Sequence, residues 1–376
     1  MDELEMKQNE EQKPEVVDTE VPLDKNLRLM SPTMMVVRRF FRSKLSIVGL
    51  IMVIGLFLFS FVGPLFLSEI PTKEAIGGTE IEVFVPNNGK WGETELDDSG
   101  KRTVGVPVEI TYTDEETGET HTFKQILETK LAYNSLAKPS KDHLLGTDEQ
   151  GYDVFVRLMY GGRISLIVSF LSVFLVTIFG VILGGIAGYY GGAVDTIIMR
   201  ICDVLMCLPG IPILLIVSTA LSSDQYDIPT EYRIYLLMAF LSLISWPGGA
   251  RLVRGQILSL REQEFMVAAE AMGYSTSRKI FKHLIPNVMP QLIVSMTLSL
   301  GSMILYEATL SYLGMGVQPP YAAWGTMINV ISTNQDILKN YPHVWVPAGV
   351  CIVIAVLGFN FVGDGLRDAL DPKARR

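Results

Sequence analysis

The chain has 376 residues, of which 49% are of hydrophobic types and only 19% are charged, whereas soluble domains carry about 25% charged residues. The formal net charge is −9, which excludes a diffuse basic surface for nucleic acid. The cysteines lie in apolar runs without the spacing of a zinc module or a disulfide framework, and we expect them to be buried: Cys202, Cys207 and Cys351. This composition argues against an ordinary cytosolic enzyme.

Residues 1–44 form a polar segment rich in Glu and Lys, without the short apolar region and cleavage site of a secretory leader. We expect residues 1–30 to be a disordered tail, with a docking helix on a partner as the alternative. The basic residues that directly precede the first apolar run are Arg38, Arg39, Arg42 and Lys44. Because Lys and Arg accumulate on the cytoplasmic side, segment 1–44 is predicted to be a cytoplasmic tail.

A bilayer core about 30 Å thick needs about 20 apolar residues in a helix. Runs almost free of charge predict six transmembrane helices, at residues 45–67, 164–190, 204–223, 234–250, 284–306 and 344–363. The uncharged stretch 308–334 contains several glycines and prolines, so we interpret it as the end of the fifth span plus a surface or re-entrant loop. Six spans place the basic segment 251–283 and a C-terminal tail, 367–376, in the cytoplasm. The predicted fold class is an all-α polytopic membrane protein.

Residues 68–145 have a soluble composition, with 15 acidic and 8 basic side chains between positions 68 and 143. They are predicted to form an acidic extracytoplasmic insert between the first two spans. Alternating patterns at 80–85, 104–113 and 120–126 predict a small antiparallel sheet, and we expect a helix over 125–133. The insert is either a solvated decoration or a docking site for an external delivery protein.

Residues 264–273 read EFMVAAEAMG, and Pro286 follows. The small side chains of Ala268 and Ala269 let a short helix lie close to a partner surface, and Gly273 permits a sharp exit. Phe265 and Met266 are candidate apolar contacts. Taken alone, the segment also fits an ordinary amphipathic connector.

This segment resembles the EAA loop of the permeases of ABC importers, with Val267 in the place of the motif's glutamate and Glu264 and Glu270 beside it. Further blocks resemble, in the same order, the oligopeptide, dipeptide and nickel permease family: GTDEQGYDVFVR at 146–157, EATLSYLGMGVQPP at 307–320 and NFVGDGLRDALDP at 360–372. Tyr152 stands where that family usually has arginine. The similarity covers residues 31–73 and 143–376 and is greatest to the C-type permease subunit.

The resemblance implies a permease core at 146–366, in a prokaryotic plasma membrane, with an ATPase-coupling loop at 258–287. The coupling residues that it implies are Glu264, Phe265, Val267, Ala268, Ala269, Glu270, Gly273 and Pro286. It further implies a homologous second permease subunit (B-type), two cytoplasmic ATP-binding subunits and an extracytoplasmic peptide-binding protein as partners.

The chain itself contains no phosphate-binding loop of the form GxxxxGK[ST]. We therefore expect no enzymatic activity and no cofactor in this chain, with ATP and Mg²⁺ bound by the partner subunits. Peptides are the expected substrate. Nickel or a nickel chelate is the alternative within the family, and a self-contained secondary transporter is the alternative outside it.

Some polar groups fall inside the predicted spans. Arg200 and Asp203 are three residues apart and can pair on one helix face, either as a structural pair or at a pathway or gate. Glu307 either lines an outer vestibule or accepts hydrogen bonds from the neighbouring loop. Gly180, Gly184 and Gly188 form a small-residue face for helix packing. Pro209 and Pro212 are expected to interrupt the third span, and the scattered histidines predict no metal site.

Overall fold

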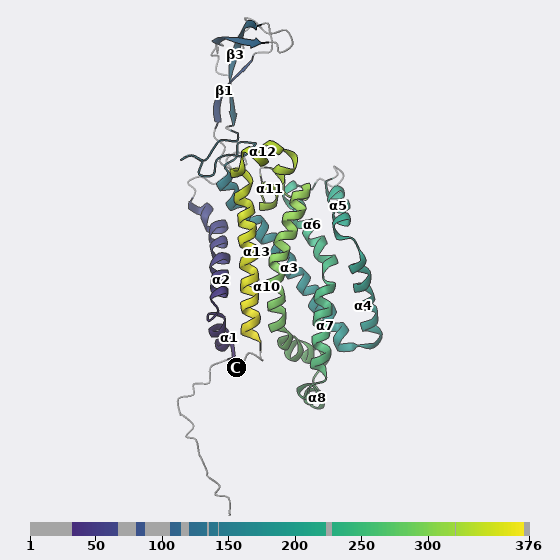
Figure 1. The fold of residues 1–376 in the computed structure, drawn as a ribbon. Helices are drawn as coiled ribbons and strands as arrows, with labels where there is room; N and C mark the ends of the chain where they lie inside the picture. The colour runs from purple at the N-terminus through teal and green to yellow at the C-terminus, as the bar shows by residue number, and fades with distance from the viewer. Residues whose placement is uncertain are drawn as a thin grey trace, which may run out of the picture.

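The computed structural model describes residues 32–66, 80–86, 106–113, 120–133, 135–141, 143–222, 228–319 and 321–371. The disordered tail expected over residues 1–30 and the side chains of the expected insert sheet lie outside the described residues. The described parts form a body of packed helices, with a small sheet beyond the end that carries α12 (Figure 1). The opposite end of the body carries α8. The predicted all-helical architecture of the membrane-embedded part is confirmed.

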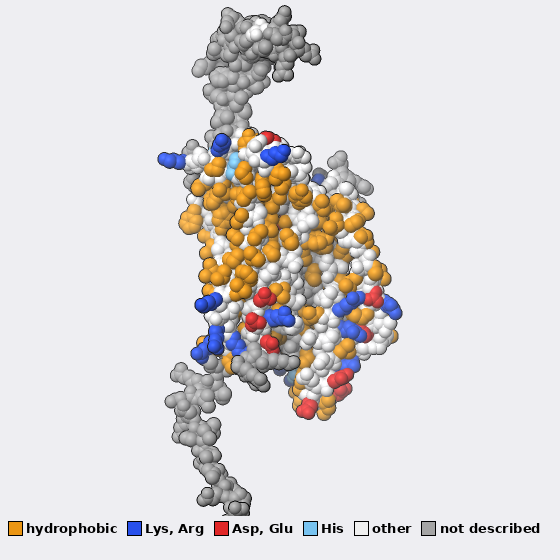
Figure 2. Space-filling model, viewed as in Figure 1, with side chains coloured by type: hydrophobic (Ala, Val, Ile, Leu, Met, Phe, Trp, Pro, Cys, Tyr) orange, Lys and Arg blue, Asp and Glu red, His pale blue; other side chains and the backbone are white. Residues whose placement is uncertain are grey.

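Helices long and apolar enough to cross a membrane number four among the described residues, or up to six if each of two bent helix pairs is one span. The four are Lys44–Phe66, Val154–Tyr190, Thr276–Met315 and Pro342–Leu370. Figure 2 shows apolar side chains over most of the middle of the body, with charged side chains gathered towards the α8 end. This is the distribution expected of a body that sits in a bilayer.

The chain enters the body through α1 (Pro32–Phe40) and turns into α2 (Lys44–Phe57), which continues as a π-helical segment η1 (Leu58–Val62) and a short 3₁₀ segment η2 (Gly63–Phe66). The side chain of Ser43 accepts a hydrogen bond from the Ser46 amide at 3.4 Å and caps α2. This corresponds to the span expected at 45–67.

The sheet consists of β1 (Glu80–Pro86), β2 (Val106–Thr113) and β3 (Thr120–Tyr133), in the order β1-β3-β2. Both pairs are antiparallel. The helix expected over residues 125–133 is wrong, because these residues form the second half of β3. There β1 supplies a strand partner for residues 127–133, and the paired backbone outweighs the local helical pattern.

Helix α3 (Val154–Tyr190) has 37 residues and begins well before the expected position 164. Asp153 caps it by accepting a hydrogen bond from the Val156 amide at 3.0 Å. Arg157 and Arg163 precede the span expected at 164–190, but both belong to the helix and both have partners. Arg157 is paired with Asp148, and Arg163 donates to the carbonyls of Ser60 and Phe61 at 2.8 and 3.0 Å.

The span expected at 204–223 is interrupted, as its prolines predict. The structure has α4 (Gly192–Cys207) and α5 (Gly210–Leu221), bent by 80° at the break between them. Pro209 lies in the break, where its ring favours an extended conformation of the preceding residue, Leu208. Pro212 lies in the first turn of α5, where a backbone N–H has no partner within the helix.

Cys207 ends α4 and is exposed, whereas Cys202 and Cys351 are buried. The expectation that every cysteine is buried is therefore wrong for Cys207, because the chain turns away immediately after it.

The span expected at 234–250 likewise divides into α6 (Thr230–Ser245) and α7 (Pro247–Arg261), bent by 40° at Trp246. Pro247 occupies the first turn of α7, which accommodates a residue without an N–H.

The remaining elements are α8 (Glu264–Ala271), α9 (Thr276–Arg278), η3 (Lys279–Leu284), α10 (Ile285–Leu310), η4 (Ser311–Met315), α11 (Trp324–Thr333), α12 (Gln335–Asn340) and α13 (Pro342–Leu370). The stretch 308–334 contains the end of α10, η4, a loop and α11, as expected of a span end followed by a loop. The ten residues of α11 extend only about 15 Å, which is too short to cross a bilayer.

The glycines at 180, 184 and 188 lie where α3 packs against α7. A Cβ atom on Gly180 would lie 3.1 Å from the carbonyl carbon of Gly249, and one on Gly188 would lie 3.0 Å from Cβ of Ile257. A Cβ atom on Gly184 would overlap the backbone of Ala250. The structure thus places these glycines in a seam that lets two helix backbones approach closely.

Candidate functional site

A cavity of about 520 Å³ lies among α3, α4, α5, α6, α7 and α10. One wall is a polar stripe on α10, which we define as Ser295, Ser299, Ser302 and Tyr306. Their spacing of four, three and four residues puts them on one face of the helix. The stripe gives the cavity a row of hydroxyl groups, each able to donate and to accept a hydrogen bond.

The other walls are mostly apolar. The apolar lining includes Val176, Leu205, Met206, Leu241, Leu252 and Met303. Thr177 and Ser245 add hydroxyl groups. Among the described residues that line the cavity, none has a charged side chain. The arrangement can therefore hydrogen-bond a neutral polar group and cover an apolar one.

The bend between α4 and α5 shapes one side of this cavity. It brings Leu205 and Met206 from α4, Leu208 from the break and Gly210 from the start of α5 to the lining of the cavity. A Cβ atom on Gly210 would lie 3.3 Å from the hydroxyl of Tyr306. The stripe on α10 and the bend therefore face one another closely at this point.

Helix α8 has an inner and an outer face. Met266 and Ala269 are 4% and 1% exposed, and Met266 packs in a cluster with Ile257 of α7 and Val288 of α10. These two residues were expected to contact a partner, but in the structure both lie on the buried face of α8. Phe265 is half-buried beside the same cluster.

The outer face of α8 carries Glu264, Val267, Ala268 and Glu270, all exposed. Val267 is 63% exposed, so the valine in the place of the motif's glutamate lies on the accessible surface. Two further large apolar side chains nearby along the chain, Met272 and Phe281, are also strongly exposed. An apolar surface flanked by carboxylates suits contact with another protein.

Gly273 ends α8 with a positive φ of +70°. The amides of Gly273 and Tyr274 donate to the carbonyls of Glu270 and Ala269, at 2.8 and 3.1 Å, which is the hydrogen-bond pattern of a glycine-terminated helix. The ring of Tyr274 lies under the guanidinium of Arg278, 4.0 Å from centroid to Cζ, and stacks on His283. Pro286 lies exposed in the first turn of α10.

Ion pairs join α4 to α7. Arg254 holds Asp195 through Nε and Nη2, and Arg251 Nη2 lies 2.5 Å from Asp203 Oδ1. Asp203 lies 3.7 Å from Arg200, its expected partner, but Arg200 is 79% exposed in its side chain. Neither Arg200 nor Asp203 lines the cavity. The sequence analysis did not identify Asp195 and Arg254 as a pair, because it used the basic residues of α7 only to place this segment on the cytoplasmic side.

Glu307 is completely buried. Its carboxylate accepts hydrogen bonds from the hydroxyls of Ser165 at 2.9 Å and Ser311 at 2.7 Å. The backbone amide of Trp324 donates in turn to Ser165 Oγ at 3.2 Å. Of the two interpretations of Glu307, the geometry fits acceptance of hydrogen bonds, since this residue lines neither described cavity. It ties α3, α10 and α11 together.

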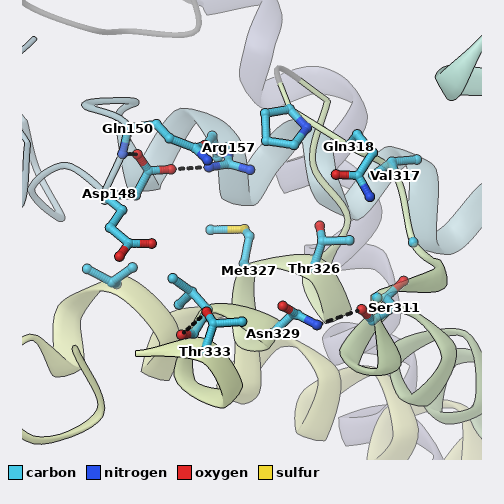
Figure 3. A pocket seen from close by; sticks show the side chains of 16 residues that line it. Asp148, Gln150, Arg157, Ser311, Val317, Gln318, Thr326, Met327, Asn329 and Thr333 are labelled. Atoms are coloured by element: carbon cyan, nitrogen blue, oxygen red, sulfur yellow. Dashed lines mark hydrogen bonds and ion pairs between the residues drawn. The ribbon is translucent and has the colours of Figure 1, made fainter. Parts of the chain in front are cut away.

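A smaller cavity of about 210 Å³ lies near the α12 end, between the start of α3, η4 and α11 (Figure 3). Arg157 is paired with Asp148 at its edge, and the backbone amides of Gln150 and Tyr152 donate to Asp148 Oδ1 at 2.9 Å. Tyr152, which departs from the family pattern, lies with its ring 5.3 Å from the guanidinium of Arg157. The helix start is thus fixed by charge and hydrogen bonds together.

Comparison with known proteins decides the family. Residues 180–376 match the model of the family described as "Binding-protein-dependent transport system inner membrane component". The chain belongs to this family of inner membrane components. Residues 31–75 also match the N-terminal TM domain of oligopeptide transport permease C. The family places this chain in a membrane as a multi-pass permease.

Relatives of this permease include the oligopeptide transport system permease protein OppC of Bacillus subtilis, 42% identical over 244 residues, which are 65% of this chain and 76% of that protein. The dipeptide transport system permease protein DppC of the same species is 43% identical over 241 residues, 63% of this chain and 71% of that protein. A solved structure of the MetNI methionine ABC transporter in inward facing conformations has a TM-score of 0.43 and 20% identity, and the match covers 57% of this chain and 96% of that chain.

In this permease the polar stripe on α10 was not singled out from the sequence. The signal was present, since hydroxyl residues recur there at helical spacing within an apolar run. A hydroxyl costs little within a membrane helix because it bonds to its own backbone, as Thr297 does with the carbonyl of Ile293 at 2.8 Å. For that reason the run was interpreted only as a span.

Proposed function

We propose that this chain is the C-type permease subunit of an ATP-driven peptide importer. It pairs with a homologous second permease around a shared pathway, and an extracytoplasmic binding protein delivers the peptide. The match of residues 31–75 to an oligopeptide permease domain and the peptide-transport names of the relatives support this assignment.

The observation that carries the peptide assignment is the chemistry of the larger cavity. Its hydroxyl stripe and apolar walls suit a substrate with a constant polar backbone and varied side chains. A nickel ion is instead held by imidazole, thiolate or carboxylate ligands. The lining therefore favours a peptide over a bare metal ion.

Coupling to ATP is proposed to run through α8. Its exposed face, with Val267 between Glu264 and Glu270, docks on a cytoplasmic ATPase that binds ATP and Mg²⁺. Only Glu262 and Gln263 separate α8 from α7, and α7 supplies one wall of the cavity through Gly248, Leu252 and neighbouring residues. A displacement of α8 therefore moves a cavity wall. The ATPases bind ATP with different affinities in the two access states of the pathway, so ATP binding shifts the equilibrium between these states.

The orientation proposed for the chain follows from its charges. The α8 end, which also carries α1 and the C-terminal end of α13 (Figure 1), faces the cytoplasm, because basic residues concentrate there. The smaller cavity and the sheet then face outwards, where a binding protein arrives.

The test is purification of the tagged chain from its native membrane in a mild detergent, followed by reconstitution into liposomes. We expect a second permease and two ATPase subunits to co-purify, and peptide uptake to require ATP and the external binding protein. Recovery of the chain alone, active without ATP, would overturn the proposal in favour of a self-contained transporter. Uptake of nickel without uptake of peptide would overturn the substrate assignment alone.

A further inference from the structure

Helix α1 exposes a row of large apolar side chains. Met34, Val37 and Phe41 are 56%, 49% and 53% exposed, and their spacing puts them on one side of the helix and of the turn that follows it. Side chains of this kind are unfavourable in contact with water. The row therefore marks a surface that is covered when the protein is in its membrane.

The opposite side of α1 is fixed to the body. Phe40 is only 8% exposed and lies at Gly365 of α13, where an added Cβ would be 3.1 Å from its ring. Arg39 Nη1 donates to the carbonyl of Asp371 at 3.5 Å. Because these contacts hold one side of the helix against α13, the apolar row must face away from the body.

Basic side chains border the row. Arg38, Arg42 and Lys44 are all exposed, with Arg38 in the last turn of α1 and Arg42 in the turn that follows it. Among the described residues, Lys44 begins the first helix that is long and apolar enough to cross a membrane. Figure 2 shows basic side chains at the lower border of the apolar face, on the side of the body where α1 meets α2.

The apolar row also continues onto α2. Leu45, Val48 and Ile51 are 50%, 47% and 65% exposed, and they belong to the span itself. The exposed apolar surface of α1 is thus continuous with that of a membrane-crossing helix, and the basic groups lie at the level where the helix begins. Apolar residues beside Lys and Arg at this level are typical of a helix that lies in the membrane interface.

We propose that α1 and the first turn of α2 form a binding surface for anionic phospholipid. Met34, Val37 and Phe41 enter the acyl-chain boundary, and Arg42 and Lys44 contact the headgroup phosphates. The basic side chains at the border complement the negative charge of anionic lipid headgroups, which favours lipid as the occupant. A protein partner that covered only the apolar surface would need no row of cations beside it. The proposal does not depend on which substrate the permease transports.

The test uses the purified complex in bilayer discs of phosphatidylcholine, with and without phosphatidylglycerol. A photoreactive phosphatidylglycerol with its reactive group near the headgroup is cross-linked and the labelled residues are mapped by mass spectrometry. We expect labelling to concentrate within residues 34–45. Unlabelled phosphatidylglycerol should reduce this labelling more strongly than phosphatidylcholine does. The variant R42Q/K44Q should lose labelling by about fivefold for each charge removed.

Two controls keep the outcome specific. R42K/K44R retains both charges and should retain the labelling. Arg200→Gln removes an exposed cation from α4, whose packing partners are α3, α6 and α7, and should leave labelling of residues 34–45 unchanged. Equal labelling by both lipids, or labelling of R42Q/K44Q at the wild-type level, would overturn the proposal.

Discussion

Arg254 holds Asp195 with two nitrogen atoms, since Nε lies 2.5 Å from Oδ1 and Nη2 lies 2.6 Å from Oδ2. The pair joins α7, which leads directly into α8, to α4, which leads into the bend beside the cavity. A two-point bond of this kind fixes direction as well as distance. It therefore resists rotation of α7 relative to α4 more strongly than a single contact would.

The first prediction concerns this pair. Arg254→Gln should lower the stability of the complex by about 1–2 kcal/mol, because Asp195 loses a charge-assisted partner in a partly buried setting. It should also lower the amount of peptide imported per ATP hydrolysed, measured in proteoliposomes. The reversed pair D195R/R254D should recover part of both quantities.

Arg200→Gln is the matched control for stability, since Arg200 is highly exposed and 3.7 Å from its acidic neighbour. Pairs of that kind contribute about 0–1 kcal/mol. If Arg254→Gln imported as much peptide per ATP as the wild type, α4 and α7 would not be coupled through this bond.

Gly184→Val should destabilise the permease by about 1–3 kcal/mol, because its Cβ would overlap Ala250 in the seam between α3 and α7. Thermal melting of the detergent-purified complex measures this. The neighbouring change Gly185→Ala is the control. Its Cβ would meet only Cδ1 of Ile257, at 3.7 Å, so the melting temperature should be unchanged or slightly raised. Equal melting temperatures of Gly184→Val and Gly185→Ala would contradict close packing of α3 against α7 at Gly184.

Gly273→Val should impair transport while membrane insertion persists. A β-branched residue at a φ of +70° costs about 1–2 kcal/mol, and α8 would no longer end at this residue with its present direction. Co-purification of the ATPase subunits should fall. Gly255→Ala on α7 should keep the ATPase, since its Cβ would meet nothing within 4 Å. Normal ATPase recovery with Gly273→Val would argue against docking through α8.

The pair S299L/S302L should block peptide uptake, because two large side chains would fill the cavity and remove hydroxyl groups from its wall. S299A/S302A should reduce uptake by about two- to tenfold, which corresponds to the loss of one or two ordinary hydrogen bonds. Thr309→Val is the control on the same helix, since its hydroxyl bonds to the carbonyl of Leu305 at 2.8 Å and does not line the cavity. If S299L/S302L took up peptide at the wild-type rate, the peptide would not pass through this cavity.

The parts of the fold that depend on long apolar runs follow from the sequence. The spans expected at 45–67, 284–306 and 344–363 each correspond to one helical segment, Lys44–Phe66, Thr276–Met315 and Pro342–Leu370. The last two segments extend beyond the expected bounds. The sharp exit at Gly273 was also predictable, since few other residues adopt that conformation.

Other features depend on contacts that the pattern of apolar runs does not reveal. The early start of α3 brings Arg157 to Asp148, nine residues earlier in the chain, whereas the sequence alone shows only a charge at the edge of an apolar run. The second half of β3 is a strand because β1 lies beside it. The inward orientation of Met266 depends on packing with Ile257 of α7, which no local pattern of residues 264–273 reveals.

The length of α3 has a mechanical consequence. Its 37 residues give a rod about 56 Å long, whereas the hydrocarbon layer is about 30 Å thick. One tip therefore stands beside Asp148 and the other beside Arg261, which donates to the carbonyl of Tyr189 at 3.1 Å. If α3 tilts as a rigid rod against α7, its two ends move in opposite directions. The helix thus offers a direct structural connection between the two membrane faces.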